Sequence, residues 1–187
     1  AVAALRDVLQ AFQAEGLPPQ REIEAAVKRD LERLATMQND DGSFGFWRRG
    51  DHDWPYLSIH VAHALVRAQA KGYAVPKEML DRSKAYLRDI RSHVPRPYGP
   101  DHRRTLEAYA LFVRQLAGDP DVARAKALLA EAKGPDKLPL EADGWLLHVL
   151  ATDPAAADEK AAILRHLGNR VTETPGAATF VTHYDDG

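Results

Sequence analysis

Four residues around the start of an apolar segment have side chains that can bind a metal ion. His60 and His63 are three positions apart, and His52 and Asp53 come shortly before them. On a helix, a spacing of three places two imidazoles next to each other on one face, where they could hold a metal such as Zn²⁺. The sequence offers no matched third ligand at helical spacing. The pattern therefore favours hydrogen-bonded or partly exposed histidines, and we predict no metal site and no cofactor.

Two pairs of aspartates, Asp40-Asp41 and Asp185-Asp186, are the next candidates for chemistry. Clustered aspartates on helices hold Mg²⁺ or protonate an alkene in terpene cyclases and prenyl transferases. Here both pairs stand next to glycine in expected turns, where aspartate is favoured for local backbone hydrogen bonds. No nucleophile motif and no glycine-rich phosphate loop occurs in the sequence. We therefore predict no catalytic residue.

Five aromatic residues surround the glycines between Asp41 and the apolar segment. They are Phe44, Phe46, Trp47, Trp54 and Tyr56. One interpretation is structural: the rings close one end of a barrel of helices, with glycine allowing tight turns around them. The other is functional: the rings line a hydrophobic pocket or shield a reactive group beside it. The sequence leaves both interpretations open.

Composition excludes several classes of protein. The chain has 187 residues, 45% of them hydrophobic, a net charge of -2 and no cysteine. This charge argues against a nucleic-acid binder, which needs a basic surface. Without cysteine the segment forms no disulfide and no thiolate site, and no run reaches the roughly 20 apolar residues of a membrane span. Because the chain begins inside a helical pattern and stops just after a strand-like run, we expect residues 1–187 to be a single partial domain.

Hydrophobic periodicity predicts a series of helices separated by short breaks that contain glycine or proline. They span residues 1–14, 20–37, 55–71, 77–92, 102–117, 120–133, 139–152 and 155–168. Segments 55–71, 102–117 and 139–152 are apolar around most of their circumference, whereas 20–37, 77–92, 120–133 and 155–168 have narrower apolar faces. A helix without a polar face must be enclosed by other helices. We therefore predict an all-α fold in which broad inner helices alternate with narrow outer ones.

Two architectures have such an alternation, an α/α toroid and an α-solenoid. A solenoid usually has a repeat of fixed length. Here the broad helices begin at unequal intervals and no motif recurs, so we predict an incomplete α/α toroid. After Gly168 the helical period is lost, and residues 176–184 alternate small or polar with bulky side chains. This pattern predicts a short extended or hairpin segment near the C-terminus.

Three segments carry a resemblance to a known family. Residues 34–47 read LATMQNDDGSFGFW, residues 54–61 read WPYLSIHV, and residues 72–76 read GYAVP. Together they resemble the thioester domain of bacterial alpha-2-macroglobulin-like proteins, and the tail from Gly176 to Asp186 looks like the segment before a further inner helix of that domain. The element Gln-x-x-Asp-Gly-x-Phe is shared with other α/α toroids, including terpene cyclases. The resemblance extends from about residue 20 to the end.

The resemblance implies a non-catalytic part of the thioester domain of a protease-trapping inhibitor. In the family, cleavage of a bait region elsewhere in the chain triggers collapse around the protease, and an exposed Cys–Gln thioester acylates a protease lysine. The thioester motif Gly-Cys-x-Glu-Gln lies ahead of the matched region in the family, and this chain without cysteine cannot form the bond itself. The aromatic residues from Phe44 to Tyr56 would then cover the reactive end.

The same resemblance implies partners and a location. The partners are proteases, bound through the full-length protein, and the neighbouring macroglobulin-like domains of the same chain. We expect no nucleic acid and no membrane contact by this segment. The implied location is the periplasm, either free or as part of a membrane-anchored lipoprotein, with a role in bacterial defence.

Two alternatives remain open from the residues alone. One is an α/α-toroid enzyme of the terpene-cyclase or polysaccharide-processing kind, which needs carboxylates on the inner helices. Glu107, Glu141 and Asp143 are the carboxylates there, and we interpret them as favourable first-turn charges. The other alternative is a helical protein-interaction module, which needs a fixed repeat that the sequence does not have.

Overall fold

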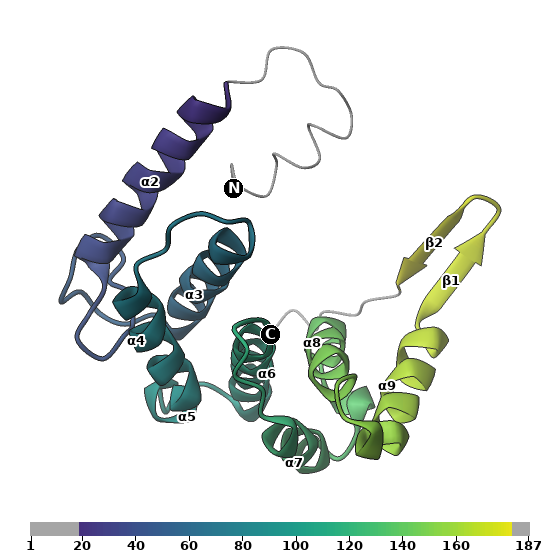
Figure 1. The fold of residues 1–187 in the computed structure, drawn as a ribbon. Helices are drawn as coiled ribbons and strands as arrows, with labels where there is room; N and C mark the ends of the chain where they lie inside the picture. The colour runs from purple at the N-terminus through teal and green to yellow at the C-terminus, as the bar shows by residue number, and fades with distance from the viewer. Residues whose placement is uncertain (1–18, 181–187) are drawn as a thin grey trace. The chain divides into compact units, whose positions relative to one another are not determined.

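The computed structural model describes residues 19–180, which fold into α-helices and one β-hairpin (Figure 1). The predicted helix 1–14, residues 181–184 of the predicted extended segment and the pair Asp185-Asp186 lie outside the described residues. The chain forms two compact units, residues 1–93 and 94–187. A single partial domain over residues 1–187 stays a prediction.

The first unit contains α2 (Gln20–Met37), α3 (Pro55–Ala70), α4 (Lys77–Arg88) and α5 (Ile90–His93). Helix α2 has the predicted bounds and buries a single stripe formed by Ile23, Val27 and Leu31. Helix α4 also buries one stripe, which includes Met79, Tyr86 and Leu87, and it packs against α3. The single buried stripe of each of these two helices is as the sequence predicts.

One predicted helix is divided. The segment 77–92 was expected to be continuous, but the helix stops at Asp89 and the short α5 follows. The Asp89 backbone leaves the helical region, and its carboxylate accepts a hydrogen bond of 2.6 Å from the Ser92 hydroxyl. Aspartate interrupts helices in this way because its short side chain competes for local hydrogen bonds.

Helix α3 is less enclosed than predicted. One side, with Pro55, Ile59, Ala62 and Leu65, is buried, but Tyr56, His60, Ala64 and Arg67 are exposed. The prediction of a helix buried on nearly every side was therefore wrong for this face. The reason is that the face consists of alanine and of side chains with a polar end, which lose little by contact with water.

The second unit contains α6 (Pro100–Leu116), α7 (Val122–Ala132), α8 (Leu140–Leu150) and α9 (Ala157–Asn169). Short 3₁₀ turns, η1 (Pro135–Lys137) and η2 (Pro154–Ala156), precede α8 and α9. The predicted broad helix α6 buries residues 106–111 in an unbroken run. It packs against α8, and the core between these helices and α7 and α9 is made of leucine, alanine, valine and isoleucine.

A two-stranded antiparallel hairpin follows α9 (Figure 1). It pairs β1 (Val171–Thr174) with β2 (Ala177–Phe180), in a register that joins Val171 to Phe180. Strand β2 confirms the predicted extended segment, whereas β1 lies just before that segment. The predicted fold class, all-α with a short hairpin near the C-terminus, is confirmed. In the described part of the chain, no helix is both long enough and apolar enough to cross a membrane.

Candidate functional site

The most elaborate local structure among the described residues is the segment between α2 and α3, which we call the aromatic loop (residues 38–54). It begins at Gln38, whose side chain is completely buried. The Gln38 amide donates a hydrogen bond of 2.9 Å to the Met79 carbonyl of α4, and its oxygen accepts one of 3.1 Å from Arg82 Nε. Its backbone carbonyl accepts a 2.6 Å bond from Arg49 Nε. One residue therefore fixes both the start of the loop and its middle against α4.

The loop next makes a tight turn that requires glycine. Gly42 has a φ of +91°, and a Cβ atom there would lie 2.2 Å from the Arg82 carbonyl oxygen. The backbone on either side is held by the bonds Asn39 N to Ser43 O and Gly45 N to Met37 O. Asp41 confirms the predicted local role, because it accepts bonds from the Ser43 amide and hydroxyl at 3.0 and 2.7 Å.

A second anchor joins the end of the loop to α3 and α4. The Ser58 hydroxyl accepts a hydrogen bond from the Phe44 amide at 2.9 Å and donates one to Asp53 Oδ1 at 3.0 Å. The other oxygen of Asp53 accepts a 2.7 Å bond from the Tyr86 hydroxyl. The pKa of Tyr86 is raised because the hydroxyl is buried and because it donates to this carboxylate. Asp53 thus connects the loop to two helices.

A third anchor shapes the tip of the loop. The amides of Trp47 and Arg48 both donate hydrogen bonds of 3.0 Å to Asp51 Oδ2. The pKa of Asp51 is lowered, first by the bond from the Trp47 amide. At the far side of the tip, the Gly50 amide donates a 2.7 Å bond to Asn39 Oδ1. The tip is therefore held in one conformation by polar contacts, although it is exposed.

These anchors place the five predicted aromatic residues in two different environments. Phe44 is buried, with an exposed fraction of 1%, and agrees with the structural interpretation of the cluster as a plug. For the other four the plug interpretation is wrong, because Phe46 is 50%, Trp47 78%, Trp54 54% and Tyr56 59% exposed. We call these four residues the aromatic surface.

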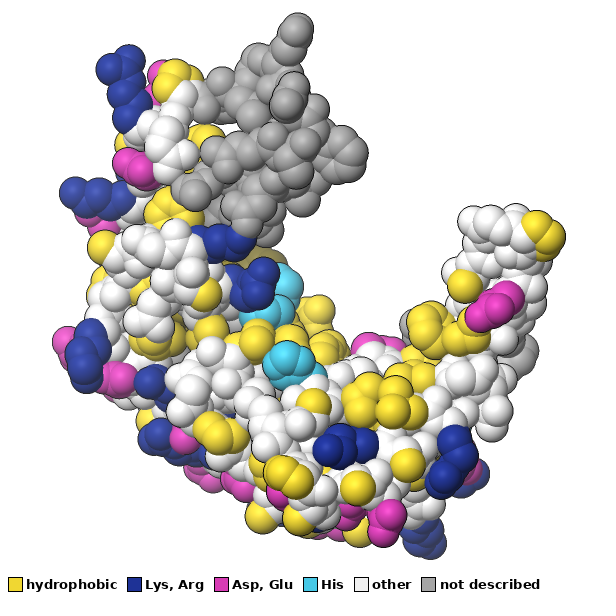
Figure 2. All heavy atoms as spheres, turned by 45° about the vertical axis from the view of Figure 1, so that its right-hand side comes forward, with side chains coloured by type: hydrophobic (Ala, Val, Ile, Leu, Met, Phe, Trp, Pro, Cys, Tyr) yellow, Lys and Arg dark blue, Asp and Glu magenta, His cyan; other side chains and the backbone are white. Residues whose placement is uncertain are grey.

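The aromatic surface is ordered internally. The rings of Phe46 and Trp47 meet edge to face, with their centroids 4.7 Å apart. The ring of Tyr56 stacks on His60 at 6.0 Å, one turn along α3. Figure 2 shows hydrophobic side chains, in yellow, exposed at several places on the face that is drawn. Large aromatic rings that are exposed and held in place are typical of a surface that another protein segment covers.

The histidines singled out in the sequence do not belong to a group of three possible ligands in the described part of the chain. Among residues 19–180, neither His60 nor His63 belongs to a group of three ligand side chains with atoms close enough to share an ion. The pKa of His63 is lowered, first because the ring is partly buried and then because Arg67 and His60 are near. The group that does have this spacing is Asp41, Asp53 and His93, which the sequence analysis did not combine.

Of the carboxylates on the predicted inner helices, Glu141 and Asp143 lie in the first turn of α8, as predicted, and Glu107 does not lie in a first turn. Glu107 lies well inside α6, and both of its oxygens accept bonds from Arg124 at 2.6 and 3.1 Å, so the first-turn interpretation was wrong for it. Asp143 does lie in the first turn of α8, but it is completely buried and neither oxygen has a hydrogen-bond partner. Burial and the charge of Asp136 raise its pKa to about 7.

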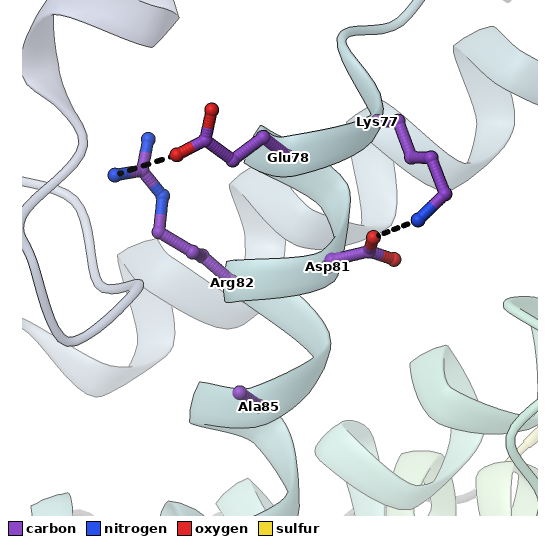
Figure 3. A pocket seen from close by; sticks show the side chains of 5 residues that line it. All are labelled: Lys77, Glu78, Asp81, Arg82 and Ala85. Carbon is purple, nitrogen blue, oxygen red and sulfur yellow. Dashed lines mark hydrogen bonds and ion pairs between the residues drawn. The ribbon is translucent and has the colours of Figure 1, made fainter.

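A shallow pocket on the outer side of α4 does not add a site. It is lined by Lys77, Glu78, Asp81, Arg82 and Ala85. Figure 3 shows that the charged side chains pair with one another, Lys77 with Asp81 and Arg82 with Glu78. Pairs at this spacing are usual on the exposed face of a helix. The aromatic surface and its anchors therefore remain the candidate site.

Comparison with known proteins gives a consistent result, although no family model matches the chain. The chain is 28% identical over 100 residues to an alpha-2-macroglobulin homolog of Yersinia pestis, which covers 54% of the chain and 5% of that protein. It is 38% identical over 64 residues to alpha-2-macroglobulin of Escherichia coli strain K12, which covers 34% of the chain and 4% of that protein. The relatives of this chain are bacterial alpha-2-macroglobulins.

The solved structures agree in fold with this result. The crystal structure of trypsin-activated alpha-2-macroglobulin from Escherichia coli matches 86% of this chain with a TM-score of 0.72 and 24% identity. The match covers 11% of the solved chain, so the present chain spans a small fraction of the proteins that it resembles. An incomplete α/α toroid is consistent with this shared fold. The resemblance to bacterial alpha-2-macroglobulins that was stated from the sequence is confirmed.

Proposed function

We propose that this chain is a non-catalytic part of the thioester domain of an alpha-2-macroglobulin-like inhibitor that traps proteases. The complete protein would act in the periplasm, with or without a lipid anchor, in defence against foreign proteases. Its partners would be those proteases and the neighbouring macroglobulin-like domains of the same chain. Support comes from the sequence relatives and from the fold shared with the Escherichia coli protein.

The proposed role of this segment rests on the exposure of the aromatic surface. Phe46, Trp47, Trp54 and Tyr56 are each at least half exposed, yet the loop beneath them is held by buried polar anchors. Exposing rings to water costs about 25 cal/mol for each Å² of apolar surface. A rigid loop and helix start that keep four rings in water are explained if another part of the full-length protein covers these rings. We propose that they cover the thioester.

The chemistry of a thioester explains why such a cover is needed. A thioester survives in water when apolar groups exclude water from its carbonyl, and it reacts when these groups move away. Indole and phenyl rings provide much apolar area with few rotatable bonds, so they exclude water at a low entropic cost. The chain itself has no cysteine and contributes no atom to the bond. Its proposed role is to exclude water from the thioester.

The enzyme alternative receives no comparable support. The Glu107 carboxylate is engaged by Arg124, and Asp143 has no exposed surface through which to contact a substrate. An acid that protonates a substrate must come within hydrogen-bond reach of it. The proposal is therefore a protein without catalytic activity of its own.

Trp47→Ala and Trp54→Ala in the full-length protein test the covering role. The matched control is Leu164→Ala, which removes a side chain of similar exposure, 56%, from α9. We expect each tryptophan variant to lose its thioester faster, by about tenfold, which corresponds to ~1.4 kcal/mol of protection. Thiol release with time, measured by a thiol reagent and by mass, gives the rate. Equal rates in the tryptophan variants and the control would refute the covering role.

The inhibitor assignment has a separate test. The sequence that precedes this chain should contain Gly-Cys-x-Glu-Gln, and the full-length protein should retain an added protease in a complex that resists denaturation. A protein that has the motif but does not retain trypsin would contradict the assignment. If the protein retains trypsin while the tryptophan variants behave as the control, the assignment stands and the covering role is lost.

A further inference from the structure

We propose that Asp41, Asp53 and His93 form a binding site for a divalent first-row transition-metal ion such as Zn²⁺. The three residues come from the turn at the start of the aromatic loop, from its end, and from the last residue of α5. Each offers one ligand atom, and these atoms all lie within 4.8 Å of one another. The site is independent of the proposed thioester cover.

The distances within the cluster are those of ligands around an ion rather than of hydrogen-bonded partners. His93 Nδ1 lies 3.7 Å from Asp53 Oδ2 and 3.9 Å from Asp41 Oδ2. A proton on Nδ1 would favour an approach of about 2.8 Å to one of these oxygens. Ligands of a tetrahedral zinc ion are about 3.4 Å apart, because each metal bond is about 2.0–2.2 Å long. The three atoms need to move only slightly to hold an ion.

Each ligand is oriented by a neighbour, as metal ligands usually are. Asp53 accepts hydrogen bonds from Ser58 and Tyr86, which fix its plane. Asp41 uses its other oxygen, Oδ1, for the Ser43 amide and hydroxyl, so that Oδ2 is left toward the cluster. The His93 ring lies against the ring of Tyr86, with centroids 4.2 Å apart.

The negative charges of the two carboxylates also favour a bound cation. Two carboxylates that approach within 4.8 Å repel each other unless a positive group lies between them. Imidazole together with carboxylate oxygen suits zinc and its neighbours better than calcium or magnesium, which prefer oxygen alone. His93 and Asp53 are both partly exposed, at 22% and 21% of the side chain, and Asp41 at 46%, so an ion can enter from solvent and keep water as a further ligand.

An ion at this position would tie the aromatic loop to α5. Asp41 and Asp53 flank the aromatic surface in sequence, and His93 belongs to the helix pair that supports it. The loop would then be closed at its base by three metal bonds in addition to its hydrogen bonds. We expect metal binding to slow hydrogen exchange in residues 38–54 by tenfold or more.

The test uses the full-length protein, freed of metal with a chelator and titrated with Co²⁺ and with Zn²⁺. Asp41→Asn removes one ligand charge while its side-chain oxygen can still accept from Ser43. The matched control is Asp40→Asn, because Asp40 is the adjacent exposed carboxylate and contacts Arg49 at 3.7 Å outside the cluster. A second variant, His93→Gln, removes the imidazole.

We expect the wild type and Asp40→Asn to bind one more equivalent of metal than Asp41→Asn and His93→Gln. The Co²⁺ complex should have a visible absorption band that the last two variants lack, and Zn²⁺ should protect residues 38–54 from exchange in the first two alone. Unchanged exchange without metal shows that the variants are folded. Equal metal binding in all four proteins, or no binding at all, would overturn the proposal and leave His93 as a charged partner of the two aspartates.

Discussion

Asp143→Asn replaces a buried carboxyl group with an uncharged amide of nearly the same shape. Asp143 is completely enclosed in the first turn of α8, and neither of its oxygens has a hydrogen-bond partner. The His166 Nε2 atom of α9 lies 3.7 Å from Oδ2. The carboxylate form is therefore poorly solvated, and the pKa is raised to about 7, first by burial and then by the charge of Asp136.

The raised pKa makes the stability of the second unit depend on pH. The folded state holds its proton up to a higher pH than the unfolded state, whose pKa is near 3.8. The stabilising contribution is therefore fully present below pH 3.8 and is lost as the pH rises toward 7. At about 1.4 kcal/mol for each pKa unit, linkage gives a loss of up to ~3 kcal/mol between pH 5 and pH 8. We expect ~2 kcal/mol, because His166 offsets part of it when charged.

Hydrogen exchange of α8 and α9 in the full-length protein measures this effect. The variant is compared with the wild type at the same pH, so that intrinsic exchange rates cancel. At each pH, the protection of α8 and α9 in Asp143→Asn is divided by that in the wild type. We expect this ratio to be about 30-fold larger at pH 8 than at pH 5. The free-energy cost of burying the amide does not depend on pH, so it cancels when the ratios at the two pH values are compared. A stability difference that does not change with pH would refute the idea that Asp143 is protonated in the folded protein at low pH.

Four other substitutions, of which Gly72→Ala is a control, test the packing described above by local hydrogen exchange. Gly42→Ala should destabilise the aromatic loop by about 3 kcal/mol, because it combines a positive φ with a clash against α4, whereas Gly72→Ala, with φ +83° and open space, should cost about 1 kcal/mol. Gln38→Leu removes the side-chain hydrogen bonds that join Gln38 to Met79, Ser83 and Arg82 of α4, and should cost about 3 kcal/mol in the same loop. Glu107→Gln removes the charge opposite Arg124, whose pKa is raised by its bonds to acidic partners, and should loosen α6 and α7 by about 2 kcal/mol. A wild-type exchange pattern in any of these variants would contradict the corresponding contact.

The helices could be predicted well where a stripe of apolar residues runs through charged ones. Helix α2 has the predicted bounds because Ile23, Val27 and Leu31 are surrounded by charges and Pro19 precedes the first turn. The break at Asp89 could not be predicted, since the apolar stripe continues through it. Strand β1 was missed because four residues with three polar side chains give no period.

The aromatic residues of the candidate site could be predicted from the sequence, but their burial and their contacts could not. Composition identified the aromatic cluster, but exposure of Trp47 and burial of Phe44 depend on which backbone groups Ser58 and Asp51 bind. These partners are set by tertiary contacts that no local pattern encodes. The approach of His93 to Asp53 is of the same kind, because the two residues belong to separate elements and meet only across Tyr86.

The polar contacts of the aromatic loop have a consequence for how such a segment can diversify. Gln38, Ser58 and Asp53 determine the path of the backbone, and none of them contributes to the displayed rings. The residues that determine the backbone path are therefore different from those that carry the exposed rings. Substitutions at Trp47 or Phe46 can alter the exposed rings while the backbone beneath them keeps its shape, so that the surface can change without a change in its support.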